Sequence, residues 1–385
     1  GSKLGGNEMK KILIVAMADS VHTARWIRQF DSDEIEFVLF PSTPHRRVHP
    51  LILQHMSQRL TSTLKISKWM KLGALPIGVF DLVFNHFFRA KLLAREINSF
   101  QPDFVHVMET QHSGYLTDRA LARVEKKPKI VLSIWGSDLF WFQRFTSHKS
   151  RIKSILKKVD YLITECHRDE ELAKSLGFLG SCIYGVPASG GFSLKEADVT
   201  ESYVAPSLRK TIAIKGYSGF VGLGPMALKT LKRVSHLLSD YSIVVFSANW
   251  KTRLIAQIVR LQTGLQIEIR MKHSQTPAEM RSLFLSSRIV IGVSKSDGLP
   301  ATIKEAAFFG AFPVQTDTSC AGEWFENGVS ILLVSADSSE SLEQALIRSL
   351  KDDRLVDTAA RINFEIAKSR MNAESVRSKI SALYS

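Results

Sequence analysis

Short apolar runs alternate with helix-like segments along the whole chain, and this alternation is typical of parallel α/β layers. The first series predicts strands at Lys11–Met17, Glu36–Phe40, Phe104–Met108, Lys129–Ile134, Tyr161–Thr164 and Ser181–Tyr184. Its helices are expected at His22–Phe30, Leu82–Ser99, Gly114–Glu125, Ser150–Val159 and Arg168–Leu176. Residues 185–208 are rich in glycine, proline and serine, and they break the pattern.

A second series of the same kind follows this break. Its strands are expected at Thr211–Lys215, Ser242–Phe246, Ile267–Met271, Ile289–Val293, Phe312–Gln315 and Ser330–Val334. Its helices are expected at Pro225–Leu238, Thr252–Leu261, Pro277–Ser286, Ala301–Phe309 and Ser338–Ser349, and the chain from Asp352 onward is helical in pattern to its end. The 385 residues therefore predict two doubly wound Rossmann-like domains, at 9–190 and 209–370, joined by a linker at 191–208. Ligands are expected at the carboxyl ends of the strands, in a cleft between the two domains.

The chain carries a net charge of +14, which favours anionic partners such as nucleic acid, anionic lipid or phosphate-bearing substrates. No acidic residue occurs between Phe37 and Phe80, and within this stretch residues 45–71 mix basic side chains with large apolar ones. That mixture suits an anionic membrane surface. It is equally typical of core residues whose basic neighbours face solvent.

The three cysteines, Cys166, Cys182 and Cys320, are widely spaced and form no CxxC pattern. This spacing argues against a disulfide framework or a zinc site and fits a reducing cytoplasm. No apolar run approaches the roughly 20 residues that are needed to span a bilayer.

One strand–turn–helix unit, SKSDGLPATIKEAAFFG from Ser294 to Gly310, carries two carboxylates eight positions apart. Asp297 and Glu305 flank a Gly-Leu-Pro turn, and Pro300 suits the first helical turn. The N–H groups of that turn and the helix dipole favour a phosphate, while Glu305 is placed to accept hydrogen bonds from sugar hydroxyls. The simpler alternative is an Asp that caps a helix and a solvated Glu.

A glycine-rich connection follows the first strand of the second domain and precedes a helix near Pro225. It contains Lys215 and, after it, Gly216, Gly219, Gly222 and Gly224. Glycines at such a position let the backbone approach a diphosphate closely, although a lone glycine-rich loop is a weak signal. Lys215 is the candidate cation.

Three candidate residues follow predicted strands of the first domain. His22 lies one helical turn before Arg25, so both side chains are expected on one side of their helix. Glu109 directly follows an apolar strand, and Asp138 follows another in the segment KIVLSIWGSD. Contacts to an acceptor or a sugar are expected from these three residues. A surface His, a capping Asp and a core Trp135 are the alternatives.

The Ser294–Gly310 unit resembles the Glu-x7-Glu region of the retaining glycosyltransferases of family 4, which have the GT-B fold. Ser294, Gly298, Glu305, Ala306 and Gly310 are in register with that motif, whereas Asp297 replaces the usual Glu. The resemblance implies that Glu305 binds the ribose of a nucleotide and that Asp297 holds hydroxyls of the transferred sugar. It also implies that the backbone at Gly298, Leu299 and Thr302 binds the diphosphate, assisted by Lys215 and Gly216.

The resemblance extends to the first domain. Gly136-Ser137-Asp138 is similar to the family's H-G-x-D segment, but Trp135 stands where a His is usual. In the GT-B fold the last helix commonly crosses back, so residues 371–385 are expected to pack on the first domain. The chain has no DxD-type pair in a loop suited to a divalent metal, so no cofactor and a metal-independent reaction are expected.

The resemblance implies a retaining glycosyltransferase that uses a nucleotide-diphosphate sugar. The basic segment 45–71 favours a saccharide or lipid-linked saccharide acceptor at the cytoplasmic membrane, as in bacterial surface-polysaccharide synthesis. Two alternatives remain from the sequence: a sugar-nucleotide epimerase of the GT-B fold, and a basic nucleic-acid-binding protein. A phosphorylase with pyridoxal phosphate is normally much longer. Because no RNA-binding or helix-turn-helix motif is present, we expect no nucleic-acid partner.

Overall fold

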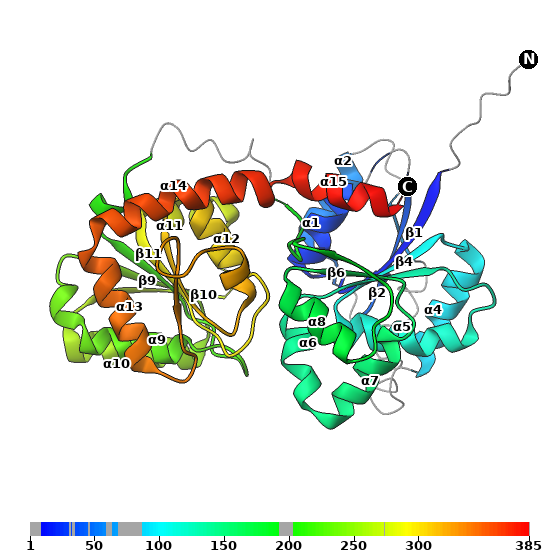
Figure 1. Cartoon of the computed structure of the whole chain (residues 1–385), viewed down its shortest axis with the longest axis horizontal. Helices are drawn as coiled ribbons and strands as arrows, with labels where there is room; N and C mark the ends of the chain where they lie inside the picture. Colours follow the sequence, from blue (N-terminus) through cyan, green and yellow to red (C-terminus); the bar gives the residue numbers. More distant parts are fainter. Residues whose placement is uncertain are drawn as a thin grey trace, which may run out of the picture. The chain divides into compact units, whose positions relative to one another are not determined.

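The structure is a computed structural model that describes residues 9–30, 32, 35–44, 47–58, 64–67, 87–191, 203–272 and 274–384. It divides into two units, which are considered separately (Figure 1). The first unit comprises Gly1–Gly191 and Ala373–Ser385, and the second comprises Phe192–Asn372.

The first unit is built on a parallel sheet of seven strands in the order β3-β2-β1-β4-β5-β6-β7. These strands are β1 (Lys10–Ala16), β2 (Ile35–Pro41), β3 (Lys65–Ile66), β4 (Phe104–Met108), β5 (Lys129–Ser133), β6 (Tyr161–Thr164) and β7 (Ser181–Tyr184). Apolar side chains alternate between the two faces. Leu13 and Val15 join one core, and Ile12 and Ile14 join the other.

Helices cover both faces of this sheet. They are α1 (Val21–Phe30), α2 (Pro50–Gln58), α4 (Phe87–Phe100), α5 (Tyr115–Ala120), α6 (Ser137–Phe140), α7 (Thr146–Leu156), α8 (His167–Ser175) and α15 (Ala373–Tyr384). Helices α1, α2 and α15 bury apolar residues on the Ile12 face, whereas α4, α5 and α7 do so on the Leu13 face. The C-terminal helix α15 thus completes the core of the first unit, with Val376 and Ile380 fully buried.

The second unit has a parallel sheet of six strands in the order β10-β9-β8-β11-β12-β13. The strands are β8 (Thr211–Lys215), β9 (Ser242–Ala248), β10 (Gln266–Met271), β11 (Ser287–Gly292), β12 (Phe312–Thr316) and β13 (Leu332–Val334). Its helices are α9 (Gly224–Arg233), α10 (Trp250–Thr263), α11 (Pro277–Ser286), α12 (Ala301–Phe308), α13 (Ser339–Lys351) and α14 (Asp353–Arg370). Residues of α9, α10 and α13 pack on one face of this sheet, and residues of α11 and α12 pack on the other.

The strand order reverses at one point in each sheet. In the first unit it reverses between β1 and β4, and in the second between β8 and β11. The loops after these neighbouring strands diverge to opposite sides of a doubly wound sheet, which leaves a crevice for ligands at the carboxyl ends. Two candidate sites are therefore fixed by topology, one on each unit.

The predicted parallel α/β layers are confirmed, and so is the capping box at Thr276, where Thr276 and Glu279 bond each other's backbone N–H. Other predictions of local structure were incomplete. Helix α2 and strand β3 were not predicted, and Thr110–Gly114 forms a π-helix ahead of α5. The continuous helix expected after Asp352 is wrong, because Met371 and Asn372 separate α14 from α15.

The basic, apolar segment 45–71 lies partly outside the described residues. In the part that the structure describes, Ile52 and Leu64 are buried, and Leu51 and Met56 pack against the same core. Leu53 on α2 is exposed. Most of the described apolar side chains of this segment therefore serve the core. Within the described residues, no helix is both long and apolar enough to cross a membrane.

Candidate functional site

In the second unit, the glycine-rich loop after β8 and the acidic loop after β11 are joined by backbone hydrogen bonds. The Leu223 N–H donates to the Val293 carbonyl at 3.2 Å, and the Lys295 N–H donates to the Val221 carbonyl at 2.7 Å. Gly222 and Ser294 pair between these two bonds as an antiparallel bridge. The two loops singled out by sequence, more than 70 positions apart, thus form one structure at the switch point of the sheet.

Lys215 and Asp297 face each other across this joined pair of loops. The Lys215 Nζ lies 3.7 Å from Asp297 Oδ2, and both side chains are about one quarter exposed. Tyr217 lies beside them: burial, and then the charge of Asp297, raise the pKa of its hydroxyl. The site therefore presents a cation, a carboxylate and a phenol that solvent reaches only in part.

Close packing explains several glycines of the loop. A Cβ on Gly222 would lie 2.3 Å from the Tyr217 carbonyl oxygen, and one on Gly224 would lie 2.8 Å from the backbone of Gly216. Gly216 in turn lies against β9, where a Cβ would meet Val245 at 2.8 Å. These contacts fold the loop back on itself, and no side chain fits at these positions without moving the backbone.

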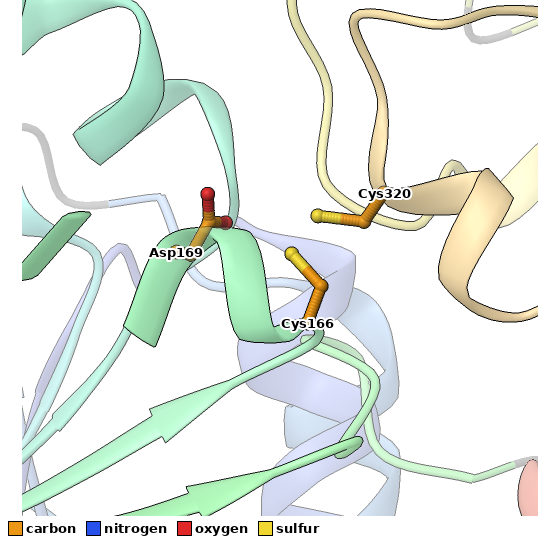
Figure 2. A group of neighbouring side chains, drawn as sticks. All are labelled: Cys166, Asp169 and Cys320. Carbon is orange, nitrogen blue, oxygen red and sulfur yellow. The ribbon is translucent and has the colours of Figure 1, made fainter. Parts of the chain in front are cut away.

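The acidic loop is anchored on its other side by the loop after β12. The Ser294 carbonyl accepts hydrogen bonds from the hydroxyls of Thr316 at 2.6 Å and Thr318 at 2.7 Å. The Cys320 N–H donates to the Gly298 carbonyl at 2.9 Å. Cys320 begins the short 3₁₀ helix Cys320–Glu323, as Figure 2 shows. The backbone around Asp297 is therefore held from both sides.

Helix α12 begins at Ala301, as expected, but Pro300 does not belong to its first turn. Pro300 has φ −59° and ψ 128°, so it precedes the helix instead of forming its first turn. The Ile303 N–H donates to the Pro300 carbonyl at 3.0 Å, and the N–H groups of Ala301 and Thr302 are oriented toward the N-terminal end of the helix. Thr302 is buried in this turn, and Glu305 follows it at intermediate exposure.

Two of the predicted diphosphate contacts are constrained by the structure. The Gly298 N–H donates to the Oδ1 of its neighbour Asp297 at 3.0 Å. The Leu299 side chain is buried in the core with Ile303, so this residue offers a ligand its backbone alone.

In the first unit, Glu109 is held in an unusual backbone conformation at the end of β4. Its φ of 78° lies in the left-handed region, where a non-glycine residue is strained. Its carboxylate caps the π-helix by accepting from the N–H groups of Gln111, at 2.5 Å, and His112, at 2.9 Å. These hydrogen bonds lower the pKa of Glu109, but burial has the larger effect and raises it to about 7.

Asp138, at the start of α6, links the loops after β4 and β5. Its Oδ2 accepts from the N–H and the hydroxyl of Thr110, at 3.1 and 2.9 Å, and its Oδ1 accepts from the Trp135 N–H at 2.8 Å. Burial, and then the neighbouring Glu109 charge, raise the pKa of Asp138 to about 7. Because both of its oxygens are occupied by the protein, Asp138 holds the two loops together.

His22 lies beside Trp135, with ring centroids 5.0 Å apart and ring planes inclined by 51°. His22 comes from α1, which follows β1, and Trp135 comes from the loop after β5. The structure therefore gathers His22, Glu109 and Asp138 near the switch point of the first sheet.

Sequence reasoning missed a basic group at the same edge. Arg89 on α4 is buried and donates to the carbonyls of Pro41 and Ser42 at the end of β2. Burial, and then the Arg89 charge, lower the pKa of His112. Thr110 and Tyr217 were also missed. Arg89 lies on the apolar side of a predicted helix, and this position could have indicated that its side chain is buried.

Cys166 and Asp169 lie at the N-terminus of α8 in the first unit (Figure 2). Cys166 is the N-cap residue, and the buried carboxylate of Asp169 accepts from Arg168 Nε at 2.9 Å. Cys320 belongs to the second unit and is described there. The expectation of a metal-independent reaction remains a prediction.

Two family models match the chain. Residues 11–166 match the family described as glycosyl transferase 4-like, and residues 226–366 match the glycosyl transferases group 1. Each match lies within one unit. The second match includes Asp297 and Glu305 but begins after Lys215 and the glycine-rich loop. No curated protein matches the chain in sequence.

Solved structures resemble the chain over nearly its whole length. HepE of Anabaena, solved in complex with UDP-glucose, has 11% identity and a TM-score of 0.70, with 97% of this chain and 98% of that chain covered. A sucrose-phosphate synthase of Thermosynechococcus elongatus has 14% identity and a TM-score of 0.71, with coverage of 97% and 98%. The lipopolysaccharide outer core galactosyltransferase WaaB has 13% identity and a TM-score of 0.64, with coverage of 96% and 98%.

At these identities the solved structures establish the fold, and the family models establish the class of enzyme. The family models agree with the resemblance of the Ser294–Gly310 unit to glycosyltransferases, and they favour neither an epimerase nor a nucleic-acid-binding protein. The predicted GT-B fold is confirmed. The chain belongs to the glycosyltransferases, with a glycosyl transferase 4-like match in its first unit and a group 1 match in its second.

Proposed function

We propose that this enzyme is a retaining hexosyltransferase that moves a sugar from a nucleotide-diphosphate sugar to a saccharide or lipid-linked saccharide acceptor. The observation that carries the proposal is the pairing of Lys215 with Asp297, 3.7 Å apart, on two loops that backbone bonds join. A cation next to a carboxylate at the start of a helix suits a donor that is anionic at its diphosphate and rich in hydroxyls at its sugar.

The donor's parts are assigned to separate groups of the second unit. Glu305 accepts hydrogen bonds from the ribose hydroxyls, and Asp297 accepts them from the transferred sugar. The diphosphate lies against Lys215, the Gly216 backbone and the N–H groups of the first turn of α12, including Thr302. The Gly298 N–H donates a hydrogen bond to the Asp297 carboxylate. A diphosphate therefore accepts a hydrogen bond from this N–H only when the carboxylate turns toward the sugar.

The chemistry follows from the charge that develops in the reaction. The bond between the anomeric carbon and the diphosphate oxygen breaks, and the sugar becomes oxocarbenium-like as the leaving group gains charge. Lys215 and the positive end of α12 stabilise that charge without a metal ion. The acceptor hydroxyl bonds to the same face of the anomeric carbon and gives its proton to the departing diphosphate, so the configuration is retained.

The acceptor is assigned to the first unit. Glu109 and His22 lie at its switch point and contact acceptor hydroxyls, while Asp138 positions the two loops that carry Glu109 and Trp135. With its pKa raised to about 7, Glu109 exchanges its proton close to neutral pH and is suited to hydrogen-bond a hydroxyl in either state. Trp135 offers an apolar ring beside His22 for a sugar to pack on.

We place the enzyme in bacterial surface-polysaccharide synthesis, on the cytoplasmic side of the membrane. The similarity to a lipopolysaccharide galactosyltransferase supports this setting. The excess of basic residues supports an anionic surface nearby. Membrane contact through residues 45–71 remains a proposal. Among the large apolar residues of this segment that the structure describes, it involves mainly the exposed Leu53.

A thermal-shift screen against nucleotide sugars tests the donor assignment. UDP-sugars come first in the panel because similar structures were solved with UDP and UDP-glucose. We expect stabilisation by one nucleoside diphosphate and its sugar. A lack of stabilisation by every member would refute the proposal.

The product then tests the reaction. A proton NMR spectrum of the glycoside should show the anomeric configuration of the donor, and an inverted product would contradict the retaining mechanism. Conversion of the nucleotide sugar to an epimer without any acceptor would instead establish the epimerase.

A further inference from the structure

Helix α10 of the second unit exposes a stripe of large apolar side chains. Trp250 is 75% exposed, Leu254 52%, Ile258 44% and Leu261 83%. Successive members of the stripe are four, four and three positions apart, so at 100° per residue they fall within an arc of about 80°. Scattered exposed apolar residues are ordinary on a protein surface, but four aligned on one outward helix face are not.

Basic residues flank this stripe on both sides. Arg253 and Arg260 follow one edge of the helix, Lys251 lies at the other, and all three are exposed. The helix sequence WKTRLIAQIVRLQT contains no acidic residue. An outward apolar face bordered by Lys and Arg is the pattern of a helix that lies in the plane of a membrane interface.

The stripe is not an inward face that failed to pack. The opposite side of α10 buries Thr252, Ala256 and Val259 against the sheet. The helix is also capped at both ends, by the Asn249 side chain on the Thr252 N–H and by Gly264 in the left-handed conformation. Helix α10 is therefore firmly seated, and its apolar stripe is a surface feature.

We propose that the Trp250–Leu261 stripe docks the second unit on an anionic lipid bilayer. Apolar side chains enter the boundary between headgroups and acyl chains, with Trp250 at the interfacial depth that indole prefers, and the three bases meet lipid phosphates. The positive charge of the three bases favours an anionic bilayer as the partner of this surface. A second copy of the chain would place like charges opposite one another, because the bases border the stripe on both sides.

The docked surface adjoins the glycine-rich loop. The Thr252 hydroxyl donates to the Gly216 carbonyl at 2.6 Å, and the Ser218 hydroxyl donates to Asn249 Oδ1 at 2.7 Å. Phe220, at the outer part of that loop, is exposed as well. A bilayer under α10 therefore lies beside the carboxyl edge of the second sheet. The inference concerns attachment, and it holds whatever sugar is transferred.

Vesicle flotation tests the proposal with the full chain. We expect binding to vesicles of phosphatidylcholine with about one third phosphatidylglycerol, weaker binding as salt increases, and little binding to phosphatidylcholine alone. The double variant Leu254→Glu/Leu261→Glu should bind at least tenfold more weakly. The matched control Leu179→Glu/Leu208→Glu changes two exposed leucines outside α10 and should bind like the parent chain.

Folding of the variants is checked by their melting temperatures and by nucleoside diphosphate binding. A second readout does not depend on the glutamate variants. The tryptophan emission of the parent chain should shift to the blue on anionic vesicles, and Trp250→Phe should abolish that shift.

Three results would overturn the proposal: equal vesicle binding by the α10 variant and the control, an unchanged emission shift in Trp250→Phe, or a parent chain that binds no anionic vesicle. If the parent chain forms a dimer and binds no vesicles, and the α10 variant is a monomer while the control variant is still a dimer, the stripe is an interface with a second copy of the chain instead.

Discussion

Lys215 at the end of β8 and Asp297 in the loop after β11 lie 3.7 Å apart, although 82 positions separate them in sequence. Their strands are neighbours because the order of the second sheet reverses between β8 and β11. The pair therefore stands at the place where a doubly wound sheet opens to a ligand. Its two charges match the two parts of a nucleotide sugar, the diphosphate and the hydroxyl-bearing ring.

Lys215→Met should impair transfer far more than it impairs folding. A partly exposed ion pair contributes about 0–1 kcal/mol to stability, so the melting temperature should change little. The leaving diphosphate loses its cation, and kcat/KM should fall by about 100-fold or more. Steady-state kinetics and a thermal melt measure the two effects. Lys229→Met, on α9, is the control, and an equal loss of activity in both variants would contradict the role of Lys215.

Gly222→Ala should weaken donor binding by displacing the joined loops. The added methyl would lie 2.3 Å from the Tyr217 carbonyl oxygen, so the backbone that pairs with Ser294 must move. We expect a stability loss of about 1–3 kcal/mol together with weaker nucleoside diphosphate binding. Gly264→Ala is the comparison, because Gly264 has a positive φ, which strains an alanine, but no atom lies within 4 Å of the new methyl. The Gly264 variant should be less stable but should bind the donor like the parent chain. If it also binds the donor more weakly, the effect of Gly222→Ala does not come from the joined loops.

Glu109 should make the first unit less stable as the pH rises toward neutrality. Its pKa is raised from 4.5 to about 7, so the fold favours the protonated form. This contribution is fully present below about pH 4.5 and is lost as the pH rises through about 7, by up to about 3 kcal/mol. Glu109→Gln should remove that part of the pH dependence.

Chemical unfolding at pH 5 and pH 8 measures the Glu109 contribution as the difference between the parent chain and the variant. Asp138, whose pKa is also about 7, contributes in the same direction in both proteins. Parallel stability curves for the two proteins would show that Glu109 does not titrate in this range.

Tyr384 should hold helix α15 to the core of the first unit. Its hydroxyl lies 2.5 Å from His106 Nδ1, and His106 Nε2 lies 2.7 Å from the Ser133 hydroxyl. Burial lowers the pKa of His106 to about 3, so this buried ring is neutral and relies on both partners. Tyr384→Phe should destabilise the protein by about 1–3 kcal/mol.

Denaturant unfolding of Tyr384→Phe, compared with that of the half-exposed Tyr184→Phe, measures the bond between Tyr384 and His106. Equal stability of the two variants would contradict a structural role for it.

The Ser294–Gly310 unit was predictable because its signals are local. An apolar run, a Gly-Leu-Pro turn and a helical pattern occur within about 20 residues, and the strand and helix lie within two residues of their expected ends. The capping box at Thr276 was predicted to the residue for the same reason. Short-range patterns of this kind depend little on the rest of the fold.

Contacts between distant segments could not be predicted from these patterns. The bond between Asp138 and Thr110, and the closure of the glycine-rich loop over Tyr217, depend on which strands become neighbours. The positive φ of Glu109 is imposed by the π-helix that it caps, and a local rule would have placed glycine there. The break at Met371 was missed because helical periodicity continues on both sides of it.

Calorimetric titration of Glu305→Ala with the nucleoside diphosphate identified in the thermal-shift screen tests the central claim most directly. The assignment predicts that this variant binds the diphosphate at least tenfold more weakly, because a carboxylate that accepts ribose hydroxyls is removed. It also predicts that Asp297→Ala binds the diphosphate like the parent chain but gains nothing from the attached sugar. Glu365→Ala, an exposed glutamate on α14, is the matched control. Diphosphate binding by Glu305→Ala as tight as that of the parent chain would contradict the account.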